Sequence, residues 1–548
     1  MKKQAMVVCP QPEAAESGID ILRAGGNAVD AAVATALAQT VVDPLMCGIA
    51  GFGTAAVYLP GAGVHEYFDF HSPAPLAARE DMWEDLLEGE TQDGFGFILK
   101  GRVNDIGPQS IATPATLKGL EAMHQAHGRL PWRQVVEPAI RWAQDGFFVR
   151  PGMHAFWIDE PTSGRVGNLE RLQYSEEGRA LYCRPDGRPK PIGAPLRNEG
   201  MARVLRRIAD EGSHPFYQGD LAREMVAHLQ SLGALITLED LARYEVQRNA
   251  PLVGSYRDRT VTTNQPPGGG AMLLEMLNIL ENFDLGAMEH NSPEYLRTVC
   301  EAMKKATSDK DRHIGDPRFF DVPLDQLLSK DMAREAAAQI RAGRRFSVER
   351  VNPGAPVPRD TTHLCVVDGD GNCVSMTHSL AMPSGVITPG MGFLYNGCMG
   401  VFDPRPGRAG SIRPGKSRFT SSCPTITFKD GRLDVVLGAP GGTQIAMGVL
   451  QVLLNVIDHG MQMQAAVSAP RFSSTSNAID VCNRIPRHTT RALQAQGYQV
   501  NRNPYNYTIA WVHGVQALPD GLHGGADPGR DGRSEERRVG KECRIGCR

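Results

Sequence analysis

The sequence predicts an α+β fold, in which β-hairpins are interspersed with amphipathic helices. Two observations indicate this class. Residues 363–367 and 373–377 have the pattern of strands, and the turn between them contains two Asp-Gly pairs, which suit a hairpin. Residues 201–232 and 294–308 instead place apolar side chains at helical spacing. At 548 residues the chain is long enough for two to four domains.

The N-terminal part predicts two helices followed by a hairpin. Residues 12–24 carry apolar side chains at helical spacing. Asn27 suits the N-cap of a second helix over residues 28–41, which is dense in alanine and therefore expected to be buried. The segments 54–59 and 64–70 alternate apolar and polar residues across a Pro-Gly turn, so we expect them to pair.

The middle of the chain predicts one strand and further helices. Residues 256–263 have the composition of a strand, and residues 271–283 and 330–342 have helical periods. A Gly triplet at 268–270 could suggest a phosphate-binding loop. Because neither a Lys-Ser/Thr pair nor a GxGxxG spacing accompanies it, a structural turn is the favoured interpretation.

Thr361 stands where an exposed loop meets a strand. The loop, residues 351–358, is rich in Pro and Gly and has no apolar period. A Thr hydroxyl is a poor nucleophile unless a base takes its proton, and the α-amino group of the same Thr can do so once the preceding peptide bond is cut. Such amines titrate near pH ~8, so a neutral fraction exists at physiological pH. The sequence therefore predicts that Thr361 becomes a chain terminus, acting as nucleophile and base.

A Gly-rich turn between a strand and a helix offers donors for an oxyanion. A hairpin over 425–428 and 433–437 leads into this turn, and a helix over 443–458 follows. Gly441 and Gly442 lie at the helix start, where backbone N–H groups favour negative charge. We expect these two amides to stabilise a tetrahedral intermediate.

The composition is that of an ordinary globular protein, with 41% hydrophobic and 22% charged residues. A net charge of −3 gives no reason to expect nucleic acid or an anionic membrane as partner. The sequence contains no apolar run of about 18 residues, and prolines interrupt its apolar N-terminal stretch, so a cytoplasmic location is expected. The 11 cysteines have irregular spacing, and His363, His378 and Asp368 lack a fourth ligand, so we predict no metal and no cofactor.

The run DTTHLCVVDGDGNCVSMTHS resembles the processing and nucleophile motif of the γ-glutamyltranspeptidase family, whose members are N-terminal nucleophile hydrolases. Further motifs of that family follow in order over nearly the whole chain, among them AAESGIDILRAGGNAVDAAVATALA, VVEPAIRWAQDGFFV, LGAPGG and GGADPGRDG. The resemblance implies a four-layer αββα sandwich. Both chains of a self-cleaved precursor would contribute strands to it.

The resemblance also implies roles for particular residues. Cleavage between Asp360 and Thr361 would give a large chain, 1–360, and a small chain, 361–532. Thr361 matches the nucleophile, Gly441 and Gly442 match the oxyanion hole, and Ser379 stands where the family has a Thr that hydrogen-bonds the nucleophile. The family ending stops just past Gly532, so we expect residues 533–548 to be non-native sequence, or alternatively a disordered charged tail.

The substrate pocket departs from the family pattern. Glutamate-specific members hold the substrate α-carboxylate with an Arg in a motif similar to FRETAP, whereas FHSPAP here places His71 at that point. The α-amino group is held there by an Asn, a Gln or Glu, and an Asp, which correspond here to Ala381, Cys398 and Val401. An unpaired buried ammonium would be costly. Thr420 and Ser421 retain hydroxyls where the family has a Ser pair.

We therefore expect a self-processing amidohydrolase that cleaves the amide of a small acidic acyl group, for example oxamate or a glutaryl amide, through an acyl-Thr intermediate. His71 could bind the acid or be a plain strand-end residue. The loop arginines Arg405, Arg408 and Arg413 could bind the acid or be solvated charges. One alternative is a γ-glutamyl hydrolase or transferase acting on glutathione, and another is an unprocessed binding protein. Water or an amine is the expected acceptor, and heterodimers of the two chains could pair.

Overall fold

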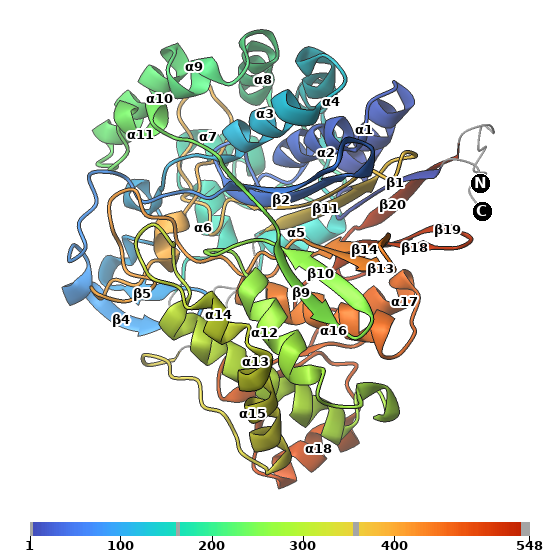
Figure 1. Cartoon of the computed structure of the whole chain (residues 1–548). Helices are drawn as coiled ribbons and strands as arrows, with labels where there is room; N and C mark the ends of the chain where they lie inside the picture. The colour runs from blue at the N-terminus through green and yellow to red at the C-terminus, as the bar shows by residue number, and fades with distance from the viewer. Residues whose placement is uncertain (1–3, 160–164, 354–360, 539–548) are drawn as a thin grey trace.

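Two antiparallel sheets form the centre of the computed structural model, which describes residues 4–159, 165–353 and 361–538 (Figure 1). The seven-stranded sheet has the order β20 (Arg533–Arg538), β1 (Gln4–Cys9), β11 (Thr362–Val367), β12 (Cys373–Ser379), β2 (Phe52–Leu59), β3 (Val64–Phe70) and β8 (Gln247–Asn249). The six-stranded sheet has the order β19 (Gly521–Gly525), β18 (His513–Leu518), β14 (Arg432–Gly438), β13 (Thr425–Lys429), β10 (Arg259–Thr263) and β9 (Leu252–Tyr256).

Helices cover the outer side of each sheet, as Figure 1 shows. The seven-stranded sheet is covered by α1 (Pro12–Arg23), α2 (Ala28–Val42), α3 (Thr116–His127), α4 (Trp132–Asp145) and α8 (Glu199–Glu211). Beside the six-stranded sheet lie α12 (Gly270–Leu280), α13 (Pro293–His313), α15 (Lys330–Arg341) and α16 (Ile445–Ile457). The remaining helices are α5 (Pro151–Trp157), α6 (Asn168–Gln173), α7 (Glu176–Tyr182), α9 (His214–Tyr217), α10 (Asp220–Ser231), α11 (Leu238–Ala242), α14 (Leu324–Leu327), α17 (Met463–Ser468) and α18 (Arg487–Ala495).

Smaller sheets complete the described part of the chain. They are formed by β4 (Leu87–Glu90) with β5 (Phe97–Leu99), by β6 (Phe147–Phe148) with β7 (Pro195–Leu196), and by β15 (Phe472–Ser473), β16 (Ala478–Val481) and β17 (Gln499–Arg502).

Side-chain alternation divides most buried apolar residues among three large cores. On β11, Leu364 and Val366 join the core under α1 and α2, whereas Cys365 and Val367 join a core that also contains Val436 of β14. The two large sheets therefore face each other across this second core. A third core lies between the six-stranded sheet and α12, α13, α15 and α16.

The mixed content of helices and sheets is confirmed, and most predicted elements lie within a few residues of their expected bounds. The strand expected over 256–263 differs, because the structure divides that region between β9 and β10. Arg257 forms the turn in a left-handed conformation, with φ of 54°. Its side chain binds the carboxylate of Asp458 and the carbonyl of Glu281, so tertiary contacts support a turn that has no Gly to signal it.

The first residues of the expected C-terminal tail are ordered rather than disordered. Residues 533–538 form β20, which pairs with β1 from Gln4 to Cys9. Strand pairing uses backbone groups, so this basic segment forms a strand without an alternating apolar pattern. Residues 539–548 of the expected tail lie outside the described part of the chain.

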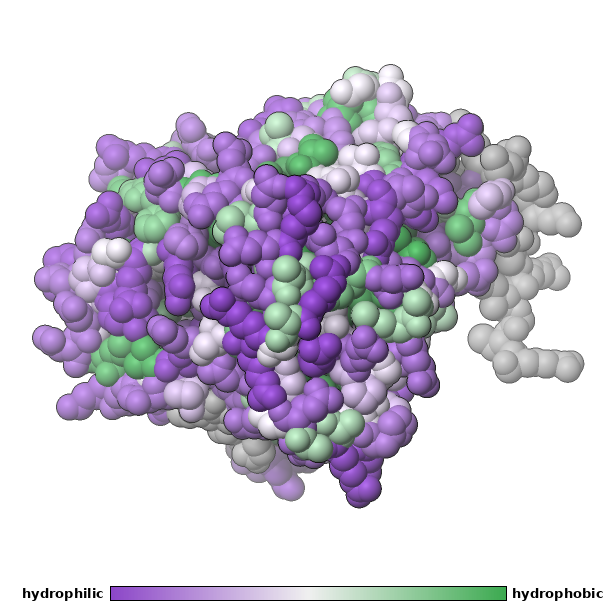
Figure 2. All heavy atoms as spheres, turned by 60° about the horizontal axis from the view of Figure 1, so that its bottom comes forward, coloured by the Kyte–Doolittle hydropathy of each residue, from purple (hydrophilic) through white to green (hydrophobic). Residues whose placement is uncertain are grey.

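The surface in Figure 2 is mostly hydrophilic, with hydrophobic side chains gathered in small separate groups. Among the described helices, none is both long and apolar enough to cross a membrane.

Candidate active site

The β11–β12 hairpin brings the two predicted hydroxyl groups together. Thr362 pairs with His378 in the register of this hairpin, so Thr361 lies beside Ser379. The Thr361 hydroxyl donates to the Ser379 hydroxyl at 3.1 Å, and Ser379 Oγ also accepts the backbone N–H of Ala381 at 2.8 Å. Both residues are buried. Asp360, on the other side of the expected cleavage point, lies outside the described residues.

One small cavity, which we call the Thr361 cavity, contains most of the predicted site residues. Its volume is about 20 Å³, room for about one water molecule. The described residues that line it are Phe52, Gly94, Phe95, Thr361, Ser379, Ala381, Val401, Arg418, Phe419, Thr420, Ser421, Gly442, Thr443 and Ile445. None of these is a carboxylate, and Arg418 is their one permanently charged residue.

The Gly-rich turn forms one end of this cavity. Gly441 and Gly442 have φ of 142° and 56°, a region that residues with a Cβ rarely adopt. A short 3₁₀ turn, Gly442–Gln444, begins here and continues directly into α16. Ser421 donates its hydroxyl to the carbonyl oxygen of Gly442 and so fixes the turn. Backbone N–H groups at such a helix start suit a developing oxyanion.

His71 does not line the Thr361 cavity. It follows β3, and the alternation of that strand places it on the side of Asp69, 3.6 Å from the Asp69 carboxylate. There it lines a separate cavity of about 370 Å³, together with Tyr244 and Arg318. Burial lowers the pKa of His71, with Asp69 opposing the shift. The structure thus gives no support to the predicted contact between His71 and an acyl group on Thr361.

The loop arginines are paired with carboxylates. Arg405 binds Asp403 through two hydrogen bonds of 2.7 Å, and Arg408 approaches the same Asp at 3.9 Å. Arg413 pairs with Glu80 at the surface. Arg405 and Arg408 line a neighbouring cavity of about 320 Å³ rather than the Thr361 cavity. The structure therefore places none of these three arginines in the lining of the Thr361 cavity. Arg418 does line it, and the sequence did not single it out because a single loop Arg carries no signal of its burial.

The substituted recognition positions are apolar or uncharged. Ala381 and Val401 line the Thr361 cavity, and Cys398 is fully buried. Burial raises the pKa of the Cys398 thiol, and the positive charge of Arg418, together with a hydrogen bond from it, opposes that rise. None of the described residues that line this cavity is acidic.

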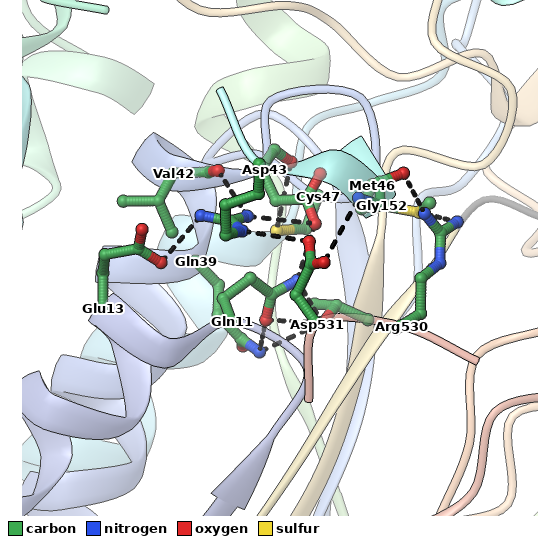
Figure 3. Close-up of polar contacts among 12 residues, drawn as sticks. Gln11, Glu13, Gln39, Val42, Asp43, Met46, Cys47, Gly152, Arg530 and Asp531 are labelled. Atoms are coloured by element: carbon green, nitrogen blue, oxygen red, sulfur yellow. Dashed lines mark hydrogen bonds and ion pairs between the residues drawn. The ribbon is translucent and has the colours of Figure 1, made fainter. Parts of the chain in front are cut away.

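A network of buried polar side chains contacts the first residue of β11 (Figure 3). The sequence did not predict this network. Thr362 Oγ1 accepts hydrogen bonds from Gln11 at 3.1 Å and from Gln39 at 3.0 Å. Gln11 also donates to Asp43 at 2.8 Å, and burial raises the pKa of Asp43. Met46 Sδ accepts the backbone N–H of Thr361 at 3.5 Å. These contacts fix the strand end on which the nucleophile stands.

The two histidines of the hairpin are sheet residues. His363 Nδ1 hydrogen-bonds Thr377 Oγ1 at 2.8 Å, and His378 Nε2 hydrogen-bonds Gln39 Oε1 at 2.8 Å. Burial lowers the pKa of both. Within the described ranges, no group of three or more His, Cys, Asp or Glu residues is arranged to hold a metal ion.

Known proteins resemble this chain over almost its full length. The family model described as gamma-glutamyltranspeptidase matches residues 14–536. The acylase ACY 1 proenzyme of Pseudomonas sp. (strain V22) is 37% identical over 528 residues, covering 95% of this chain and 91% of that protein. The glutathione hydrolase proenzyme of Escherichia coli (strain K12) is 33% identical over 545 residues, with coverages of 96% and 90%. The crystal structure of cephalosporin acylase from Bacillus halodurans superposes with a TM-score of 0.84 at 28% identity, covering 97% and 96%.

Proposed function

Because this chain belongs to the γ-glutamyltranspeptidase family of self-processing amidohydrolases, we propose that it cleaves the amide of a small acidic acyl group, such as oxamate or a glutaryl amide, through an acyl-Thr361 intermediate. The single observation that carries this proposal is the lining of the Thr361 cavity. It offers a nucleophile and one cation, but no described carboxylate that could hold the α-ammonium of a γ-glutamyl group.

The proposed reaction uses groups of this chain alone. Cleavage before Thr361 frees its α-amino group, which takes the proton of Oγ1 while that oxygen attacks the amide carbonyl. The N–H groups of Gly441 and Gly442 hold the resulting oxyanion, and Ser379 orients Thr361 Oγ1. The amine leaves with the proton, and water then hydrolyses the acyl ester by the same route in reverse order.

The proposal includes the finer architecture and the chain division. We assign the four-layer αββα sandwich of N-terminal nucleophile hydrolases, and the three stacked cores support this assignment. The large chain would comprise residues 1–360 and the small chain would begin at Thr361. Thr361 is already the last residue before β11, so a cut there leaves the sheet intact.

Self-processing is tested first on a denaturing gel. Purified protein should give fragments of about 39 and about 20 kDa, the shares of the two parts in the 59.5 kDa chain. Thr361→Ala should remain one full-length band and hydrolyse no amide. A single band from the unmodified protein under all conditions would instead favour the uncleaved binding protein.

The acyl group is tested with purified, processed protein. Oxamate and glutaryl amides should be hydrolysed. In contrast, γ-glutamyl p-nitroanilide should be a poor substrate, because its ammonium would lack a partner in the Thr361 cavity. Efficient turnover of the γ-glutamyl substrate would support the second candidate, a glutathione hydrolase, which is the name of the 33% identical relative.

A further inference from the structure

Arg418 is an exception among the buried arginines in the described part of the chain. It is 5% exposed, and no described carboxylate lies within the 4.0 Å of an ion pair. Each of the other buried arginines has such a partner: Arg150 with Glu13, Arg165 and Arg171 with Asp105, and Arg471 with Asp527. Burying a cation without a neighbouring anion costs folding free energy. A bound anionic group could compensate the charge of Arg418.

The contacts of Arg418 leave part of its guanidinium available. Its Nη1 donates to the carbonyl oxygen of Phe419 at 2.8 Å, and its central carbon lies 4.3 Å from the centre of the Phe52 ring. Its Nε is buried without a hydrogen-bond partner. The Cys398 thiol also contacts the guanidinium. The ring, the carbonyl and the thiol hold the side chain in one orientation, while its Nε donor stays unused.

The position of Arg418 relates it to the nucleophile. Arg418 lines the Thr361 cavity together with Ser379 and Gly442. The other candidate cation that the sequence suggested, His71, lies in the separate larger cavity, and burial lowers its pKa, which favours its neutral form. An anionic group that enters the Thr361 cavity therefore meets Arg418 as its one fixed positive charge among the described lining residues.

We propose that Arg418 forms a carboxylate-binding subsite that selects the acyl group. Its guanidinium receives the free carboxylate of the acyl chain in a two-pronged contact, while the amide carbonyl at the other end lies against Thr361. Both ends bind along the lining of the Thr361 cavity, which has room for about one water molecule and must widen to admit the acyl group, so we expect only a few carbons between them. This inference rests on the proposed amidohydrolase function and names its substrate class, short ω-carboxyacyl amides.

The test compares two substrates that differ only in the charge. Glutaryl p-nitroanilide carries the carboxylate, and pentanoyl p-nitroanilide replaces it with a methyl group. We expect the unmodified enzyme to favour glutaryl by on the order of 100-fold in kcat/KM. Arg418→Met should lower kcat/KM for the glutaryl substrate and so remove most of this preference. Its kcat/KM for the pentanoyl substrate should stay within about threefold of the unmodified value. Arg418→Lys, which keeps the charge but loses the fork, should fall between them.

Arg413→Met is the matched control, because Arg413 belongs to the same loop but pairs with Glu80 at the surface. It should leave both kcat/KM values unchanged. Self-cleavage on a gel and the thermal unfolding midpoint report whether each variant is folded. If Arg418→Met does not fold, the comparison is made on Arg418→Lys.

Calorimetric titration with glutarate separates this inference from the proposed function. The unmodified protein should bind glutarate, Arg418→Met should bind it at least tenfold more weakly, and pentanoate should bind to neither. Glutarate binding through Arg418 without turnover of any amide would refute the amidohydrolase and leave the subsite standing. Equal turnover of the two anilides, or a glutarate affinity that survives Arg418→Met, would overturn the subsite and leave the amidohydrolase intact.

Discussion

At the scale of single residues, the hydroxyl of Ser379 is a direct hydrogen-bond partner of the nucleophile. It accepts hydrogen bonds from Thr361 Oγ1 and from the backbone N–H of Ala381. Ser379→Ala should lower kcat by about 10- to 100-fold, because Thr361 loses its orientation, with KM little changed. Steady-state kinetics on processed protein measures this effect.

One variant and one stability measurement control the Ser379 experiment. Ser379→Thr retains a hydroxyl and should keep most of the activity. Ser379→Ala also leaves the Ala381 N–H unpaired, at a cost of about 1–3 kcal/mol, so its unfolding free energy must be measured in parallel. An alanine variant with unchanged kcat would show that Thr361 needs no orientation by Ser379.

The sequence was sufficient to find residues whose position follows from local structure. Thr361 and Ser379 occupy facing ends of one hairpin, and Gly442 begins a helix, so their patterns are visible in the chain. Local patterns of this kind could not show which of His71 and Arg418 lines the Thr361 cavity. Which of the two enters the Thr361 cavity depends on strand alternation at the end of β3 and on the path of a long loop, and neither leaves a pattern in the sequence.

At the scale of elements, the turn before α16 requires glycine for two separate reasons. A Cβ on Gly442 would lie 2.8 Å from the ring of Phe95, and its φ of 56° is unfavourable for residues with a side chain. Gly442→Ala should therefore destabilise the fold by about 1–3 kcal/mol and lower kcat at least tenfold, because the amide donors move.

Gly431→Ala controls for backbone strain alone. Gly431 has a similar φ of 72° in the β13–β14 turn, but a Cβ there would meet no atom within 4 Å. Gly431→Ala should lower the unfolding free energy by about 1 kcal/mol and leave kcat unchanged. Denaturant unfolding and kinetics compare the two variants, and equal kcat values would exclude a catalytic role for the geometry of the Gly442 turn.

Elements whose turns carry a local signal were predictable from the sequence, whereas elements held by tertiary contacts were not. The hairpins at β11–β12 and β13–β14 turn at Asp-Gly pairs, a local signal that needs no tertiary contact. The β9–β10 turn has Arg257 in the left-handed conformation instead, held by distant groups, and β20 pairs through its backbone with the edge of β1. Such elements depend on the assembled fold, so the sequence pattern does not indicate them.

At the scale of the whole molecule, the strand order joins the two expected fragments. In the seven-stranded sheet β1 lies between β20 and β11, and β12 pairs with β2, so strands from before and after Thr361 are interleaved in one sheet. The fragments should therefore elute together on native size exclusion and separate only in denaturant. Separate elution in native buffer would show that this shared sheet does not hold them together.

Stability should fall as the solution is acidified, because the protein buries histidines in neutral form. Burial lowers the pKa of His378 and of His513 to about 3 and lowers that of His363 as well. In the unfolded chain a His binds its proton near pH ~6.5. Between these values the unfolded state holds more protons, so each such His removes about 1.4 kcal/mol of unfolding free energy per pH unit as pH falls.

The slope of stability against pH can be assigned to one residue. In a Thr361→Ala background, which keeps a single chain, denaturant unfolding is measured between pH 7 and pH 4.5. His378→Gln should be less stable at pH 7, but its decline with acidification should be shallower by about 1.4 kcal/mol per pH unit below pH ~6. Glu275 and Asp43 act in the opposite sense, since burial raises their pKa values, but they contribute equally to both proteins and cancel in the difference. Parallel pH profiles would mean that His378 accepts a proton in the folded sheet, which its burial between β12 and α2 argues against.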